Sequence, residues 1–465
     1  MLSYAALVPH PPMIIPAIGG NSLKEVESTV DAMQMVAETL VKSAPEAIIF
    51  LTPHGNVFRD CITGLDGARL YGDFSHFGQP NLSFTALNDL ALLREISLLA
   101  VKRGIDFILI DEDIAHRNRL NAQLDHGILV PLHYLRAAGL GEDIPLLAIS
   151  VGGLSVLDLY TLGKCIQEAA DNLGRNVAIV ASGDMSHRLK SDGPYDYHPD
   201  GPAFDHLVKD YLAQGDVEAL LNISENLREN AGECGYRSIV IMLGGMDSYT
   251  IIPQIYAYEG PLGVGYLTAG FSLGDKKASY LDKLIKEKAE IIGERRNKES
   301  PPVRWARLVL ENYITKGIKP DLPPEMQDLE KEQAAAFVTL KKGGKLRGCI
   351  GTILPVYPSL AQELAHNAIS AGTNDSRFLP VEADELQDLE YSVDILSNPE
   401  KSSRAELNPK EYGVIVSKGH RRGLLLPALE GVDTVEEQLA IALEKAGINP
   451  RENYTIERFK VKRYY

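Results

Sequence analysis

The chain has 465 residues, of which 45% are hydrophobic and 24% are charged, and these proportions exclude disordered and fibrous proteins. The length indicates two or three domains. The formal net charge is -16, which argues against a nucleic-acid partner because proteins that bind phosphate backbones present basic surfaces.

The four cysteines are scattered along the chain, and none of them forms a Cys-x-x-Cys pair. This pattern excludes a zinc ribbon and a dense disulfide framework, and it suits a reducing cytosol. The first residues carry no basic segment, and no apolar run approaches the ~18 residues that a membrane-spanning helix needs. We therefore expect a cytoplasmic protein without a membrane partner.

Residues 1–272 alternate short apolar runs with helical stretches. The segments "EAIIFLTPHG", "DFILID", "IPLLAISVGG" and "NVAIVASGDMSH" each predict a buried strand that runs into a Gly- or Ser-containing loop. Strands rich in Ile, Val and Leu that alternate with helices are typical of a mixed or parallel sheet covered by helices on both faces. We predict an α/β domain, with its functional residues at the carboxyl ends of the strands.

The composition changes between residues 273 and 302. This segment is dense in Lys, Glu and Arg and ends at a double proline. Such a composition predicts an exposed helix followed by a linker, so we place the domain boundary here.

Residues 303–465 carry signals of a different kind. Two strand-like runs around Gly343-Gly344 predict a hairpin. Ser359 and Thr434 each stand three residues before a Gln or Glu, a spacing typical of the capping box that opens a helix. Hairpins beside helices, without regular alternation, predict a smaller α+β domain.

Nine of the eleven histidines lie in the first 206 residues, and three of them follow predicted strands. His10 follows "YAALVP", His54 follows "AIIFLTP", and His187 follows "VAIVASGDMS". Prolines beside His10 and His54 stiffen the backbone that directs them. Because neutral imidazole is the commonest metal-binding side chain, these two histidines indicate a metal site.

A third, anionic ligand would complete the arrangement of two histidines and a carboxylate found in non-haem Fe(II) oxygenases. Glu233 is the best candidate, because it stands just ahead of an apolar helix in "ENAGECGYRSIVIMLGG". The spacing leaves Glu225, Glu229 and Cys234 open as alternatives.

With "VPHPP", "TPHG", "LDHGILVPL" and "SGDMSH" in this order, the first domain resembles the class III (LigB-type) extradiol dioxygenases, which cleave catechol rings with Fe(II) and O2. The resemblance implies that His10, His54 and Glu233 bind ferrous iron. It also places the family's catalytic histidine on His187 and the histidine of its "DHG" motif on His126. We expect His187 to act as the base toward a catechol, and His126 to stabilise or protonate the oxygen species as the ring opens.

The same domain also resembles the Memo proteins, relatives of these dioxygenases in which a cysteine-glycine motif stands near the metal site. The segment "ECGYRSI" matches that motif. Cys234 would then replace Glu233 as the third ligand, and a sulfur ligand favours a softer or redox-active metal. The alternative function is therefore a Memo-like metal-binding component, and metal-assisted hydrolysis ranks last.

The C-terminal domain resembles the AMMECR-type domain through "FVTLKKGGKLRGCIGTI", "NDSRFLPVEADEL" and "YSVDILSNPE". Proteins with this domain are linked with Memo-like and radical-SAM partners in the AmmeMemoRadiSam system. We expect partners of these kinds besides a small aromatic substrate and O2, and the sequence leaves self-assembly into a homo-oligomer open. Within the domain, Arg347 stands two residues before Cys349 and could lower the pKa of its thiol, but a buried, inert cysteine is the more common outcome. Arg377 is a candidate for binding an anion.

Overall fold

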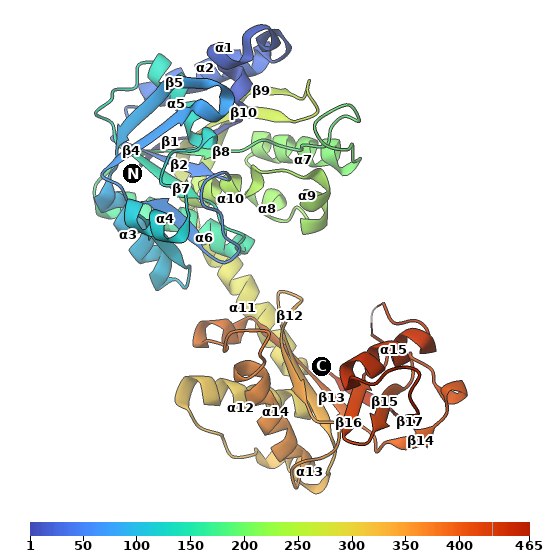
Figure 1. The fold of residues 1–465 in the computed structure, drawn as a ribbon. Coiled ribbons are helices and arrows are strands. Elements are labelled where there is room, and N and C mark those ends of the chain that lie inside the picture. The colour runs from blue at the N-terminus through green and yellow to red at the C-terminus, as the bar shows by residue number, and fades with distance from the viewer. Residues whose placement is uncertain (430) are drawn as a thin grey trace. The chain divides into compact units, whose positions relative to one another are not determined.

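The computed structural model describes residues 1–429 and 431–465, with the side chain of residue 384 outside the description. The chain divides into two compact units, Met1–Lys286 and Glu287–Tyr465 (Figure 1). This boundary falls inside the charged segment 273–302 and within helix α11 (Tyr280–Lys298). Among the described residues, none of the helices combines the length and the apolar character needed to cross a membrane.

The first unit is built on one eight-stranded sheet. The four predicted strands form β2 (Ala47–Thr52), β6 (Phe107–Ile110), β7 (Leu146–Ser150) and β8 (Val177–Ser182). The central strands β7, β2, β8 and β1 pair in parallel, whereas β9, β10 and the β3–β7 pairing are antiparallel, so the predicted mixed α/β fold is confirmed. In spatial order the strands are β6 (Phe107–Ile110), β3 (Ile62–Leu65), β7 (Leu146–Ser150), β2 (Ala47–Thr52), β8 (Val177–Ser182), β1 (Leu2–Val8), β10 (Tyr266–Lys276) and β9 (Tyr249–Glu259).

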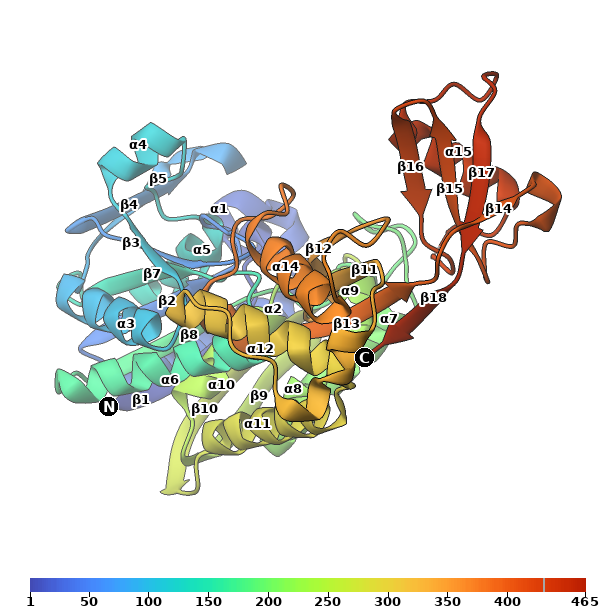
Figure 2. The same cartoon turned by 90° about the horizontal axis from the view of Figure 1, so that it is seen from below.

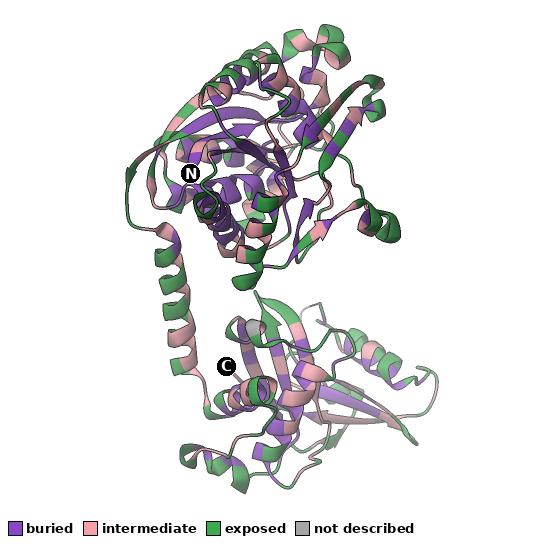
Figure 3. Cartoon of the chain, turned by 90° about the vertical axis from the view of Figure 1, so that its left-hand side faces the viewer, coloured by how far each residue is buried: buried purple, intermediate pink, exposed green. Residues whose placement is uncertain are grey.

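Helices cover both faces of this sheet. In β1, Ala5 and Leu7 face one buried cluster, while Tyr4, Ala6 and Val8 face the other. The central strands are buried, as Figure 3 shows, and they are apolar over most of their length because helices cover both faces of the sheet. The first cluster packs against α3 (Leu90–Lys102), α6 (Val156–Asn172) and α10 (Tyr236–Gly245), and the second against α2 (Glu27–Lys42) and α5 (His126–Ala137).

Shorter elements surround the sheet. The strands β4 (Arg69–Phe74) and β5 (Gln79–Leu87) form a separate hairpin, whose tip is a 3₁₀ turn at Ser75–Phe77. The remaining helices of this unit are α1 (Pro16–Gly19), α4 (Glu112–Asn118), α7 (Asp200–Gln214), α8 (Val217–Leu221) and α9 (Glu225–Ala231).

The loops that follow β1, β8 and β2 open at one edge of the sheet, because these three strands are neighbours and run in parallel. The N-terminus of α10 packs directly onto the loop after β8. A Cβ atom added to Gly183 would come within 2.1 Å of the Cα atom of Gly235, so only glycine permits this close approach. The segment ahead of α10 is thereby held at the same edge as the strand-end histidines.

The second unit contains two four-stranded sheets, β12-β11-β13-β18 and β14-β17-β15-β16. The predicted hairpin is β11–β12, with Gly343 and Gly344 at positive φ in the turn. The capping box of Thr434 opens α15, and Ser359 caps α14, which lies beside α12 (Figure 2). The elements are α12 (Pro301–Lys316), α13 (Asp328–Lys331), β11 (Ala336–Lys342), β12 (Lys345–Gly351), α14 (Leu360–Thr373), β13 (Leu389–Leu396), β14 (Glu400–Ser402), β15 (Gly413–Lys418), β16 (Arg421–Leu425), α15 (Val435–Ala446), β17 (Thr455–Phe459) and β18 (Val461–Tyr464).

Candidate metal centre

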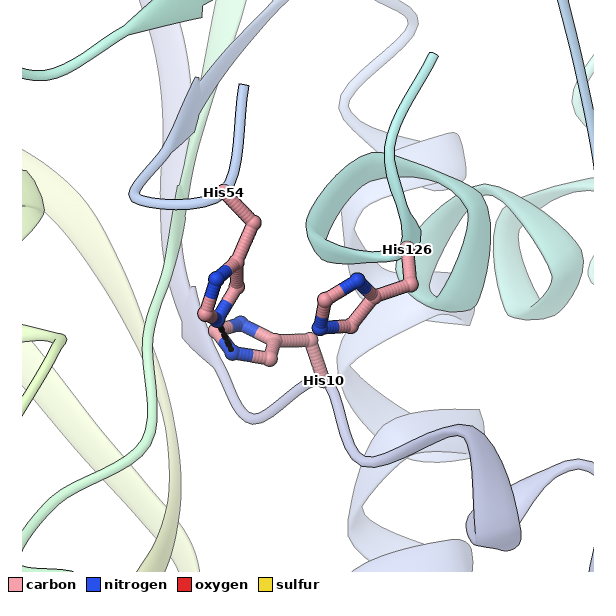
Figure 4. A group of neighbouring side chains, drawn as sticks. All are labelled: His10, His54 and His126. Atoms are coloured by element: carbon pink, nitrogen blue, oxygen red, sulfur yellow. Dashed lines mark hydrogen bonds between the residues drawn. The ribbon is translucent and has the colours of Figure 1, made fainter. Parts of the chain in front are cut away.

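His10 and His54 meet at the carboxyl edge of the sheet, as Figure 4 shows. Their Nε2 atoms lie 2.9 Å apart, and the two rings meet edge to face at 85°. Two nitrogen ligands that each lie about 2.1 Å from one metal ion, at a right angle, are about 3 Å apart. The spacing of the two Nε2 atoms therefore matches that of a pair of metal ligands.

His10 is buried, and its second nitrogen is also engaged. Its Nδ1 atom lies 2.9 Å from Oγ of Ser182, and that hydroxyl donates its only proton to the carbonyl oxygen of Gly127 at 2.5 Å. The serine oxygen can therefore only accept from His10, which fixes the proton of the neutral imidazole on Nδ1. The lone pair of Nε2 is left free to face His54.

Asp184 and Cys234 also approach Nε2 of His10. Oδ2 of Asp184 lies 3.8 Å from Nε2 of His10, and Sγ of Cys234 lies 3.7 Å from it. The backbone holds these side chains in place, because the amide of Asp184 donates to Sγ of Cys234 and the amide of His10 donates to Oδ1 of Asp184. The ligand atoms of His10, Asp184 and Cys234 all lie within 4.8 Å of one another.

Burial disfavours the charged form of every one of these groups. It lowers the pKa of His10 well below its ordinary value, raises the pKa of Asp184 to about 6, and raises the pKa of the Cys234 thiol. Imidazole, carboxylate and thiol groups gathered in a buried site are the donor set that transition metals prefer, and a divalent cation would stabilise the deprotonated acids. The residues present therefore fit a transition-metal ion.

His126 begins α5 and belongs to a second group with His10 and His54, whose ligand atoms also lie within 4.8 Å of one another. Its ring stacks on that of His54, with the centroids 4.3 Å apart and the planes at 27° (Figure 4). Burial, assisted by His10, lowers the pKa of His126 to about 3, so this imidazole is neutral at pH 7.

Glu233 precedes Cys234 in the chain, but its carboxylate contacts the first turn of α10. Its carboxylate accepts a hydrogen bond of 2.6 Å from the backbone N–H of Tyr236 in the first turn of α10. Burial raises the pKa of this carboxyl group. Among the described residues, Glu233 belongs to neither of the two groups around His10, so its role as a metal ligand stays a prediction.

His187 lies five residues beyond β8, in a loop whose backbone is tied to the end of α9. Its amide donates to the carbonyl of Ala231, and its ring stacks on Tyr195 with the centroids 5.3 Å apart. Nε2 of His187 is buried and has no hydrogen-bond partner in the described part of the chain. Burial lowers the pKa of this histidine, so a neutral nitrogen is left to meet a bound molecule.

Phe77, at the tip of the β4–β5 hairpin, lies beside His126. The two ring centroids are 5.5 Å apart, and Phe77 remains 39% exposed. The amide of Leu124 donates to the carbonyl of Tyr71, which fastens the hairpin to the loop that carries His126. The sequence reasoning did not single out Phe77, which lies outside the quoted motifs, or Ser182, which stands in "SGDMSH" but was given no role there.

Residues 4–269 match the family model described as the catalytic LigB subunit of aromatic ring-opening dioxygenase. The chain belongs to the LigB family. Residues 303–464 match the AMMECR1 family model, so a LigB unit is followed by an AMMECR1 unit, as the motifs of the sequence predict.

One relative matches nearly the whole of this chain, and another matches about a third of it. Protein CA_C1420 of Clostridium acetobutylicum is 41% identical over 466 residues and covers 98% of both chains. A protein of Thermotoga maritima is 57% identical over 171 residues, which are 36% of this chain and 98% of the relative.

Two solved structures show partial similarity. Protein JW3007 of Escherichia coli K12 aligns with a TM-score of 0.41 at 20% identity, over 57% of this chain and 98% of that one. Protein PH0010 of Pyrococcus horikoshii aligns with a TM-score of 0.33 at 32% identity, over 35% of this chain and 88% of that one.

In the AMMECR1 unit the candidate arginines pair with carboxylates. Arg347 binds Glu385 through two bonds of 2.7 and 3.0 Å, so its guanidinium is committed to this carboxylate. Sγ of Cys349 instead lies 3.2 Å from the hydroxyl of Thr339. Arg377 likewise binds Asp375, at 2.7 and 2.9 Å.

Proposed function

We propose that the LigB unit is a ferrous-iron-dependent dioxygenase of the extradiol type, which opens a catecholic or related aromatic diol with O2, and that the AMMECR1 unit is accessory to it. His10 and His54 are the proposed iron ligands, and Asp184 and Cys234 are the proposed further donors. The facing Nε2 atoms of the two histidines, 2.9 Å apart in a chain of the LigB family, support this function most strongly.

Bound Fe(II) would supply a centre at which a diol and O2 are held together. His187 is the proposed base: its neutral, unpartnered Nε2 can accept a proton from a substrate hydroxyl group. His126 is neutral at pH 7, because its pKa is about 3. It therefore acts as a hydrogen-bond donor toward the oxygen atoms of the reacting molecule, and not as an acid.

Phe77 gives the proposed substrate site an aromatic wall. Its ring is part-exposed, and its centroid lies 5.5 Å from that of His126. Aromatic rings attract one another edge to face or offset, with centroids about 4.5–7 Å apart. The exposed ring of Phe77 beside His126 therefore favours an aromatic substrate.

The position of Cys234 favours a second candidate function. A thiol 3.7 Å from Nε2 of His10 is suited to a softer or redox-active metal. The first unit would then be a Memo-like metal-binding component that acts with a radical-SAM partner and performs no ring cleavage.

One experiment separates the two functions. The full chain is purified without oxygen, its bound metal is measured, and O2 uptake is followed with a panel of catechols. Iron in stoichiometric amount, with O2 uptake and a ring-opened product, supports the dioxygenase. Stoichiometric metal without uptake for any catechol supports the Memo-like component.

A further inference from the structure

We propose that the Asp125–Gly127 segment is a bracket that orients both metal-binding histidines, through Ser182 on one side and Thr52 on the other. The bracket rests on the metal-binding part of the proposed function and is independent of ring cleavage. It assigns a role to the two residues that flank His126, and it makes Ser182 and Thr52 positioning residues for the metal site.

The first arm runs from His10 through Ser182. Nδ1–H of His10 donates to Oγ of Ser182, which donates in turn to the carbonyl oxygen of Gly127. Ser182 is fully buried, so water cannot replace either bond. A single hydroxyl proton therefore determines which nitrogen of His10 carries a proton and which presents a lone pair.

The second arm runs from the backbone of His54 through Thr52. The amide of His54 donates to Oγ1 of Thr52 at 3.2 Å, and that hydroxyl donates to Oδ1 of Asp125 at 2.7 Å. Thr52 is the last residue of β2 and is 1% exposed. This bond fixes the backbone turn that carries the imidazole of His54 from the end of β2 toward His10.

Both arms end on the same short segment. The amide of Gly127 donates to Oδ1 of Asp125 at 2.8 Å. This bond links Asp125, which accepts from Thr52, to Gly127, whose carbonyl accepts from Ser182. A Cβ atom on residue 127 would lie 2.5 Å from Oγ1 of Thr52 and 2.8 Å from Oδ1 of Asp125. Only glycine leaves room for both arms to close.

The bracket makes the free energy of metal binding more favourable, because it holds both histidines in the metal-binding orientation before the metal arrives. Without the Ser182 arm, neutral His10 would exchange its proton between Nδ1 and Nε2, and part of the population would block the metal-binding nitrogen. Without the Thr52 arm, the turn that carries His54 would lose its hydrogen bond to the sheet edge.

The test measures binding of Co²⁺ to the metal-free full chain by calorimetry. Ser182→Ala and Thr52→Val should each weaken binding by about 10–100-fold, the usual effect of removing a group that orients a ligand. Thr52→Ser keeps the hydroxyl and should restore the wild-type affinity. Ser238→Ala, which removes another fully buried serine hydroxyl that donates to Leu51, should leave the affinity unchanged.

A second readout needs no metal. In the chain labelled with ¹⁵N-histidine, nitrogen chemical shifts should show His10 with its proton on Nδ1, and Ser182→Ala should give a mixture of tautomers. A proton on Nε2 of His10 in the wild type would overturn the bracket, and so would wild-type Co²⁺ affinity in both Ser182→Ala and Thr52→Val. A wild-type chain that binds no Co²⁺ contradicts the proposed function instead, and the tautomer measurement then decides the bracket alone.

Discussion

The sulfur of Cys234 lies 3.7 Å from Nε2 of His10, although 224 residues separate the two in the chain. The close packing of Gly183 on Gly235 brings them together, since it holds the segment ahead of α10 against the loop after β8. The neighbouring carboxylate of Glu233 meanwhile accepts a hydrogen bond from the helix itself. Cys234 therefore faces the histidines, whereas the adjacent Glu233 contacts the N-terminus of α10.

This difference predicts the outcome of substitutions in the segment. Cys234→Ala and Asp184→Asn should each reduce metal affinity, because both side chains approach Nε2 of His10. Glu233→Gln should retain the metal and lower stability by about 1 kcal/mol, since it weakens the hydrogen bond from the amide of Tyr236. Metal titration and thermal unfolding of the three variants check this expectation. Loss of metal in Glu233→Gln alone would return the ligand role to the carboxylate.

His187 should affect turnover and leave metal content unchanged. Its unpartnered Nε2 is placed to accept a substrate proton, so His187→Gln should lower kcat by about 10²–10⁴-fold, the range typical of a lost general base. Iron content and the rate of O2 uptake with the best catechol are measured side by side. A variant that turns over at the wild-type rate would exclude His187 as the base.

Phe77 should affect substrate binding more than turnover. Phe77→Ala removes an aromatic wall worth about 0.5–1.5 kcal/mol of ring contact, so KM for an aromatic diol should rise by about 2–10-fold. Leu87→Ala, at the far end of the same hairpin, is the matched control for loss of an exposed apolar side chain. Equal KM values for the two variants would place the substrate away from the hairpin tip.

Asp205 should make the stability of the LigB unit depend on pH. Burial raises its pKa to about 7, although it accepts bonds from the amide of Ser186 and the hydroxyl of Tyr258. Between pH about 4 and 7 the folded state holds a proton that the unfolded state has released, so this group makes stability fall as pH rises through that window, by up to ~1.4 kcal/mol per pH unit.

Asp205→Asn removes this titration. Relative to the wild type, the variant should gain in Tm steadily from pH 4 to pH 7 and show no further gain above pH 7. Thermal scans of both proteins at matched pH values measure the difference. A difference in Tm that does not change with pH would show that Asp205 titrates near its ordinary value.

The strand-end histidines were predictable from sequence because of topology. Parallel neighbours deliver the residues after their carboxyl ends to one edge, so apolar runs ending at His10, His54 and His187 were sufficient to indicate a shared site. The choice between Glu233 and Cys234 was not predictable in the same way. It depends on which of the two adjacent side chains the turn ahead of α10 directs toward His10, and the sequence does not show this.

Ser182 and Thr52 stand in the motifs "SGDMSH" and "TPHG", but the sequence does not show what their hydroxyl groups contact. Each lies at the end of an apolar strand, where it reads as an ordinary small residue. Its role depends on hydrogen bonds to residues at least 55 positions away along the chain, in α5 and its cap. Phe77 was missed for a similar reason, since only the packing of the hairpin on the loop before α5 brings it to His126.

The iron content of His10→Ala and His54→Ala, purified without oxygen, tests the central claim most directly. His133→Ala is the control, because His133 is a part-buried histidine in α5 whose pKa is likewise lowered by burial. We predict stoichiometric iron in the wild type and in His133→Ala, and little or none in the other two variants. Stoichiometric iron retained in both His10→Ala and His54→Ala would contradict the metal site and the function built on it.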